Sequence, residues 1–345
     1  MSTIKAIGRY LDQPLLVGKF TKALPATLTT GAALFAANEV RKAPEGKKKK
    51  TALNTGIVLA ATVASALAAP RIASAIVRKP LEKVNLNEIK QANKELVEGF
   101  LSENPVSKTV KNVLEKAKSK VLGIKDMKTL NKEIGNTENG KKFIDEFVPE
   151  PENITSKDIL RDVGRLSILG LVPVVGGVTG GIVADAVTDK KHCKEKLPNK
   201  IKEGAYQYLA NIMLCNVGAA GALGIMEAAK VKSKAARAAS MVAGIFATGV
   251  IGGSAIANVI SKKCIDPLLG CKKNTEARNE KLYSERTPEA LDIGLHVDDI
   301  ATVAVMSGLR WIEPALPILY SISGYRAGIG YRNGKEQKEQ KELKG

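Results

Sequence analysis

The stretch "LVPVVGGVTGGIVADAV", residues Leu171–Val187, places four glycines inside an apolar run of helical length. Glycine costs about 1 kcal/mol relative to alanine inside a helix, so a helix here needs a compensating contact. Gly176 with Gly180 and Gly177 with Gly181 form two overlapping GxxxG pairs. Inside lipid, such pairs let a neighbouring helix approach closely, and van der Waals contact then drives association. The stretch therefore predicts a tightly packed membrane helix.

Two further features bear on this packing. Gly249 and Gly253 repeat the four-residue spacing in a later apolar run. Pro173 precedes the glycines and is expected to kink the helix, freeing a carbonyl that a neighbouring helix must satisfy. We expect leucine at Gly177 or Gly180 to disrupt the packing. Leucine at Val178 is expected to be tolerated.

Long uncharged runs recur along the chain. They cover 20 residues at Thr51–Pro70, 19 at Leu166–Ala184, 21 at Tyr206–Met226 and 24 at Ala238–Ser261. A helix needs roughly 20 apolar residues to cross a bilayer, so these runs qualify, whereas Ala23–Asn38 with 16 falls short. A soluble bundle would show a polar stripe opposite each apolar one, and the last run has no charged face. The sequence predicts an all-α, polytopic membrane protein of Ala/Gly-rich helices.

The charge distribution favours the same class of protein. The net charge is +18, and residues 1–80 hold 13 Lys/Arg against 3 Asp/Glu, whereas residues 81–162 hold 15 of each. Much of the excess lies in short segments beside apolar runs, such as Arg41–Lys50 and Lys230–Arg237. Basic loops of this kind are typical of membrane proteins that face anionic head groups. Nucleic-acid binding is disfavoured because only 4% of residues are aromatic and available for stacking.

These patterns predict four regions. Residues 1–80 form a basic segment with a first helical hairpin in the membrane, and residues 81–162 form a neutral, extramembrane helical module. Residues 163–330 form the membrane helical domain, and residues 331–345 a charged, disordered tail. Within the module, apolar periodicity and capping residues predict helices over Leu86–Phe100, Pro105–Val121 with Asn104 as the cap, Lys125–Ile134 and Glu138–Phe147.

Charged residues inside apolar segments are candidate functional residues because burying them in lipid is costly. Arg310 and Glu313 stand three residues apart in a sixth run, Ile300–Tyr325, which prolines interrupt. In one interpretation Arg310 binds an anion or Glu313 carries a proton; in the other, the two neutralise each other as an intramembrane pair. Other acidic residues lie at helix ends and are expected to be solvated: Glu39, Asp185 and Glu227.

Cysteine spacing gives one further candidate. Cys193, Cys264 and Cys271 emerge on the same side if the third, fourth and fifth runs all span, and a disulfide among them can form if that side is oxidising. A zinc site that includes His192 lacks the C-x-x-C spacing. The sequence also contains no hydrolase, metalloprotease or dinucleotide-binding motif. We therefore expect no catalytic, cofactor or metal site.

We interpret the chain as a non-enzymatic, multi-pass integral membrane protein, a scaffold or membrane-organising component that associates through small-residue helix grooves. Its expected partners are anionic lipid head groups, contacted by Lys/Arg loops, and either a second copy or another membrane protein, with no nucleic acid. One alternative is a transporter or channel with its pathway near Pro173, Arg310 and Glu313. Another is a soluble, basic helical protein that binds anionic surfaces or nucleic acid.

The topology contains one conflict. If every run spans, Arg41–Lys50 and Lys230–Arg237 fall on opposite sides of the membrane, although both are basic. The positive-inside rule places basic loops on one side. The shortest run, Ala23–Asn38, has too few residues to span and is expected to be re-entrant or to lie on the membrane surface.

Overall fold

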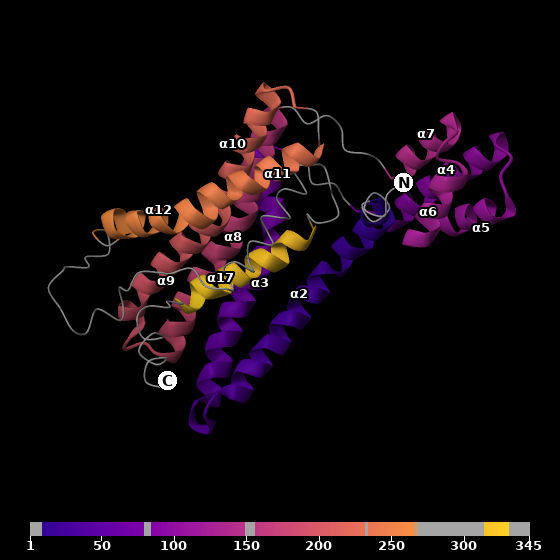
Figure 1. The fold of residues 1–345 in the computed structure, drawn as a ribbon. Helices are drawn as coiled ribbons and strands as arrows, with labels where there is room; N and C mark the ends of the chain where they lie inside the picture. Colours follow the sequence, from indigo (N-terminus) through magenta and orange to yellow (C-terminus); the bar gives the residue numbers. More distant parts are fainter. Residues whose placement is uncertain are drawn as a thin grey trace, which may run out of the picture. The chain divides into compact units, whose positions relative to one another are not determined.

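The computed structural model describes residues 9–78, 84–148, 156–231, 234–265, 267 and 314–330. Every regular element within these residues is a helix (Figure 1), which confirms the all-α prediction. The chain divides into two compact units. Of the described residues, the first unit contains 9–24, 84–148 and 314–315, and the second contains the remainder.

Four short helices build most of the first unit: α4 (Leu86–Glu103), α5 (Lys108–Ala117), α6 (Ile124–Glu133) and α7 (Glu138–Phe147). The start of α2 (Pro14–Lys42) joins them. Their buried residues form one apolar core, in which the Phe143 ring lies 4.7 Å from Phe100 and 5.9 Å from Phe147. The predicted stripes therefore pack on one another, and α6 and α7 start within one residue of their predicted positions.

The start of α5 differs from the prediction. The helix begins at Lys108 rather than Pro105, because the Ser107 hydroxyl accepts a hydrogen bond from Val110 N at 3.3 Å and caps it. Asn104 instead ends α4, where its Nδ2 donates to the Phe100 carbonyl at 2.9 Å. A side chain that resembled an N-cap in the sequence thus satisfies a carbonyl at the preceding helix end.

Gln13 fixes the N-terminal segment to this unit. Its Nε2 donates to the Leu122 carbonyl and its Oε1 accepts from the Leu122 amide, both at 2.8 Å. Both residues are buried, and Arg9 forms an ion pair with Asp145 at 2.8 Å. Residues 9–24 therefore belong with this unit, although their basic composition had grouped them with the first hairpin.

Replacing Gln13 with methionine should destabilise the first unit. The variant leaves the Leu122 amide and carbonyl buried without partners, which costs about 1–3 kcal/mol. Hydrogen exchange of the Leu122 amide in the full-length protein measures the effect. Gln91→Met is the control, because Gln91 is exposed and its Nε2 donates within α4 to Glu95. Equal protection of Leu122 in the wild type and in Gln13→Met would contradict this account.

The second unit contains the later part of α2 and a set of packed helices: η1 (Glu45–Lys47), α3 (Lys48–Val77), α8 (Ser156–Thr188), α9 (Cys193–Tyr208), η2 (Leu209–Met213), α10 (Leu214–Ala228), α11 (Lys234–Ile245), η3 (Phe246–Ile251), α12 (Gly252–Ile260), η4 (Ser261–Ile265) and α17 (Leu316–Ile329). Elements η2, η3 and η4 are π-helical. The helix α8 packs against α3, α9 and α17, and α10 packs against α11.

Three helices of this unit are long and apolar enough to cross a membrane: Glu45–Val77, Arg161–Thr188 and Cys193–Ala228. The last is continuous through α9, η2 and α10 and starts well before the predicted run. The run Ala238–Ser261, predicted as one span, lies in a helix that is continuous through α11, η3, α12 and η4. Within its described residues, Ala239–Gly249 forms a shorter apolar helix, so the predicted span stays a prediction.

Candidate functional site

The four glycines of α8 contact two different helices. On one face, a Cβ added to Gly177 would lie 1.8 Å from the Gly324 carbonyl oxygen of α17. A Cβ added to Gly181 would lie 1.9 Å from the Gly328 carbonyl oxygen. Because both obstacles are backbone atoms, no side-chain rotation relieves either clash. These two positions allow α8 and α17 to touch backbone to backbone.

A neighbouring face of the same helix, about 100° around the helix axis, meets α3. A Cβ on Gly176 would lie 2.0 Å from Ser65 Oγ, and one on Gly180 would lie 2.5 Å from Ala61 Cβ. Helix α8 is thus held between α3 and α17 through alternate glycines. The groove predicted from the sequence is filled within the chain itself and is not open to a partner.

The remaining predicted packing positions also lie at helix contacts. A Cβ on Gly249 would lie 2.1 Å from Cys215 Sγ, and one on Gly253 would lie 3.0 Å from Ala210 Cα. Val178 does not face away from the bundle, because its Cγ2 would lie 2.9 Å from a Cβ on Gly204 of α9. The expected tolerance of leucine at Val178 is therefore not supported by the packing.

Alanine at Gly177 or Gly181 should destabilise the second unit by about 1–3 kcal/mol, because the added methyl overpacks a backbone contact. The midpoint of thermal unfolding in detergent micelles measures the loss. Gly164→Ala is the matched control on the same helix, since nothing lies within 4 Å of its added Cβ. That control should keep or raise the midpoint, as alanine is the better helix former. Equal midpoints for all three variants would argue against the contact.

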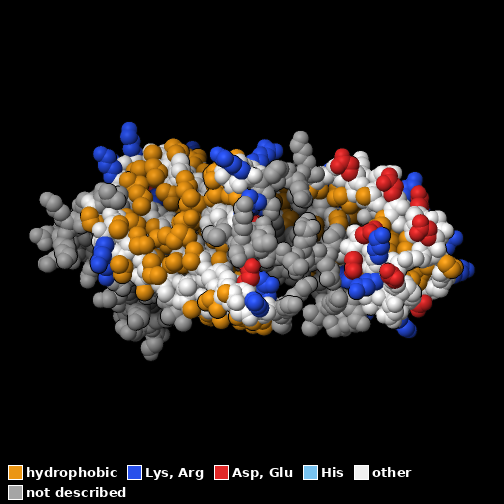
Figure 2. Space-filling view, turned by 90° about the horizontal axis from the view of Figure 1, so that it is seen from above, with side chains coloured by type: hydrophobic (Ala, Val, Ile, Leu, Met, Phe, Trp, Pro, Cys, Tyr) orange, Lys and Arg blue, Asp and Glu red, His pale blue; other side chains and the backbone are white. Residues whose placement is uncertain are grey.

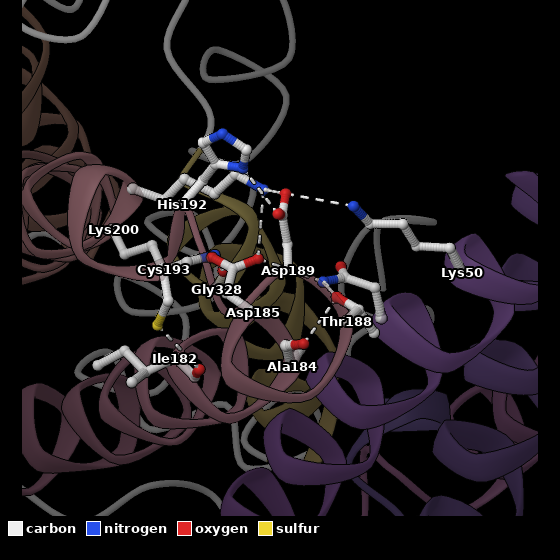
Figure 3. A network of polar contacts seen from close by, with 12 residues as sticks. Lys50, Ile182, Ala184, Asp185, Thr188, Asp189, His192, Cys193, Lys200 and Gly328 are labelled. Atoms are coloured by element: carbon white, nitrogen blue, oxygen red, sulfur yellow. Dashed lines mark hydrogen bonds and ion pairs between the residues drawn. The ribbon is translucent and has the colours of Figure 1, made fainter.

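A polar cluster lies where α8 turns into α9 (Figure 3). It comprises side chains from α3, the end of α8, the connecting turn and α9: Lys50, Asn54, Asp185, Asp189, His192, Lys196 and Lys200. The cluster brings together residues more than 130 positions apart in the chain, such as Asn54 and Asp185.

Asp185 and Lys200 form the buried part of this cluster. Asp185 Oδ2 lies 3.0 Å from Lys200 Nζ, and both side chains are 4% exposed. Lys200 also donates a hydrogen bond to the Gly328 carbonyl, and Asn54 Nδ2 donates to Asp185 Oδ1 at 3.4 Å. Asp185 was expected to be solvated; this is wrong, because α9 folds back over the end of α8 and covers it.

Asp189 forms the outer part of the cluster. Lys196 Nζ and His192 Nδ1 each lie 2.8 Å from its carboxylate, and Lys50 Nζ lies 3.2 Å away. Lys196, His192 and Lys50 hold the pKa of Asp189 well below the ordinary 3.8. Because the pKa is lower in the folded state, this stabilisation is present above about pH 4 and is lost as the pH falls below it.

Replacing Asp185 with asparagine should leave Lys200 as an uncompensated buried charge, at a cost of about 3–5 kcal/mol. The double variant Asp185→Asn with Lys200→Met removes both charges and should recover much of that loss. Thermal unfolding in micelles compares these two variants with Glu195→Gln, which changes an exposed acid on α9, the helix of Lys200. A double variant no more stable than Asp185→Asn alone would contradict the pairing.

A second polar feature, not predicted from the sequence, lies deeper along α9 and η2. Glu203, Gln207 and Asn211 are 0, 0 and 2% exposed. Gln207 Nε2 donates to Glu203 Oε1 at 2.8 Å, and Asn211 Nδ2 donates to Gln207 Oε1 at 3.1 Å. We call these three residues the polar row. Their four-residue spacing was the available signal, but Glu203 precedes Tyr206, where the predicted uncharged run begins.

Other predicted site residues are placed only in part. Cys193 and Cys264 are free thiols, and Cys193 Sγ lies 3.8 Å from the Ile182 carbonyl oxygen. Arg310, Glu313 and Cys271 lie outside the described residues. The predicted charge pair and the pairings of Cys271 therefore stay predictions.

Comparisons with protein-family models, with curated proteins and with solved structures find no match. Across the described ranges, no three His, Cys, Asp or Glu side chains gather into a group that would hold a metal ion. The chemistry of the second unit's surface and of its buried polar groups therefore has to indicate the function.

Proposed function

We propose that this chain is a multi-pass integral membrane protein in which α3, α8 and the continuous α9–α10 helix cross the bilayer. We propose further that its role is structural rather than enzymatic, as a scaffold that organises other components in the membrane. The observation that carries the membrane assignment is the outward-facing surface of these three helices.

That outward surface is apolar. Within the most apolar stretch of each helix, only 33% of the residues of Glu45–Val77 and 44% of those of the other two are buried. Large side chains left outside include Ile76 at 62%, Val187 at 58% and Ile225 at 71% exposure. Figure 2 shows hydrophobic side chains covering a broad face of the second unit, with Lys and Arg mainly around its edge. Such a surface is costly in water and favourable in lipid.

The basic residues support contact with anionic head groups. The Lys50–Asp189 pair places the α2–α3 turn and the α8–α9 turn at one end of the bundle. Lysines 47–50, 190, 191 and 194 therefore gather at that end, where they attract anionic lipid by about 1 kcal/mol each. By the positive-inside rule we place this end in the cytoplasm. Lys230 follows α10, at the opposite end of the continuous α9–α10 helix from this basic end.

The scaffold role is argued from the surfaces that the packing glycines leave open to a partner. The glycines of α8 hold the bundle of one chain together, so association with a second copy or another membrane protein falls to the outward apolar faces. The outer face of α10 is one such surface: Gly221 and Gly224 have open space at their Cβ positions, beside exposed Val217 and Ile225.

The membrane assignment predicts retention and sidedness. After alkaline carbonate extraction the protein should stay with the membranes. In a background without native cysteines, Lys49→Cys and Lys230→Cys should react with a membrane-impermeant maleimide from opposite sides. Both positions are exposed. Release into the supernatant would reject the membrane assignment, and labelling of both cysteines from one side would reject the proposed crossing of α9–α10.

A further inference from the structure

Helix α2 is not among the three helices that are long and apolar enough to cross a membrane by themselves. Its uncharged run, Ala23–Asn38, covers about 24 Å at 1.5 Å per residue, less than a hydrocarbon core of about 30 Å. Most side chains of this run are nonetheless exposed, including Leu34 at 68% and Phe35 at 40%. Whether water or lipid surrounds them depends on where the two ends of α2 lie.

The end of α2 lies at the basic end of the bundle. Helix α2 ends at Lys42 and α3 begins at Lys48, so only residues 43–47 separate the two helices. In the first turn of α3, Lys50 pairs with Asp189 of the α8–α9 turn at 3.2 Å. The end of α2 is therefore on the same side of the membrane as the turn between α8 and α9.

The start of α2 is held to residues 84–148. Directly before the helix, Gln13 exchanges two hydrogen bonds with the Leu122 backbone, both at 2.8 Å. One turn into α2, a Cβ built on Gly18 would lie 2.9 Å from Leu86 Cδ2, so α2 packs closely on the start of α4. The start of α2 therefore lies on whichever side of the membrane holds this part of the chain.

The order of the helices along the chain determines that side. Residues 84–148 lie between the end of α3 and the start of α8. If α3 and α8 both cross, α3 leaves the basic end and α8 returns to it, so the residues between them emerge on the opposite side. Residues 81–162 hold 15 Lys/Arg and 15 Asp/Glu, and this charge keeps them in water.

We propose that α2 crosses the bilayer as a fourth membrane helix and that its exposed, uncharged face contacts lipid acyl chains. The inference rests on the proposed crossing of α3 and α8. Because α2 starts on one side of the membrane and ends on the other, it has to pass through the hydrocarbon core. Its 29 residues cover about 43 Å, which is long enough. Residues 84–148 then lie on the non-cytoplasmic side.

Helix α2 suits this position in spite of its short uncharged run. Lys22 directly precedes the run, and beyond it Lys42 pairs with Glu39 at 3.6 Å. Long basic side chains lay their stems along apolar surface and place their charge among the head groups, which extends a short run at both ends. The Phe35 ring lies 5.1 Å from the Tyr325 ring of α17, so the later part of α2 packs on the bundle.

Cysteine labelling of the full-length protein tests the crossing. Single cysteines replace three exposed lysines in a background without native cysteines: Lys19→Cys near the start of α2, Lys49→Cys at the basic end and Lys111→Cys on α5. In sealed membrane vesicles of one orientation, a membrane-impermeant maleimide should label the first and third from one side and Lys49→Cys from the other. Labelling of Lys19→Cys from the side of Lys49→Cys, with Lys111→Cys opposite, would overturn the crossing of α2 alone. Labelling of Lys111→Cys from the side of Lys49→Cys would instead reject the proposed crossing of α3 and α8.

Fluorescence quenching tests the contact with acyl chains. Gly31→Cys carries a bimane fluorophore in the middle of the run, where nothing lies within 4 Å of an added Cβ. In vesicles of phosphatidylcholine and phosphatidylglycerol, lipids brominated in the middle of the acyl chain should remove more of its fluorescence than lipids with a nitroxide on the head group. Gly99→Cys, an equally open glycine of α4, is the matched control and should lose no fluorescence to the brominated lipids. Stronger quenching from the head group would place α2 on the membrane surface, and no quenching from either lipid would mean that protein covers this face. Either result would overturn the inference.

Discussion

The close approach of backbones at the α8 glycines is the contact on which the second unit depends. Gly181 lets α17 come near enough for the Gly328 carbonyl to lie against α8. That same carbonyl accepts a hydrogen bond from Lys200, which pairs with Asp185. A side chain at Gly181 would therefore disturb a buried ion pair as well as a helix contact. The glycines lower the helix propensity of α8, and packing on both of its faces offsets that cost.

The polar cluster shows how two carboxylates at the end of α8 find different partners. Asp185 is buried and relies on Lys200 and Asn54, whereas Asp189, one turn later, has partners that reach water. Buried pairs gain little net free energy because desolvation opposes the Coulomb attraction. In this bundle the pair fixes the alignment of three helices. Lys200 reaches both Asp185 and Gly328 only when α8, α9 and α17 are correctly aligned. The cluster therefore specifies the arrangement more than it stabilises it.

Sequence patterns predicted the positions of helices better than they predicted which helices pack against each other. Apolar periodicity located α6 and α7 of the first unit, and glycine spacing marked the positions where α8 is closely packed. The pattern did not show that Gly176 meets Ser65 while Gly177 meets Gly324. A glycine in a helix indicates that another helix packs closely there. Which helix it is depends on the tertiary arrangement.

The start of α9 was not predicted for a related reason. The fourth uncharged run begins at Tyr206, because the residues before it carry charges, and charge in a sequence usually means exposure. In the structure, Lys200 and Glu203 face inward and are buried. The signal was their spacing, three and four residues apart up to Gln207, which places them on one helical face. The periodicity of these residues therefore indicates their burial better than their polarity does.

The short helix α17 connects these features. Its 14 residues are too few to cross a bilayer, yet Leu316, Tyr320 and Ala327 are fully buried. It ends at Gly330, whose φ of +67° favours glycine and stops the helix. The last carbonyls of a helix lack partners and carry partial negative charge. Lys200 supplies both a donor and a positive charge to Gly328 at this end. A helix that ends inside the bundle thus explains why a lysine is buried there, next to the carboxylate that neutralises it.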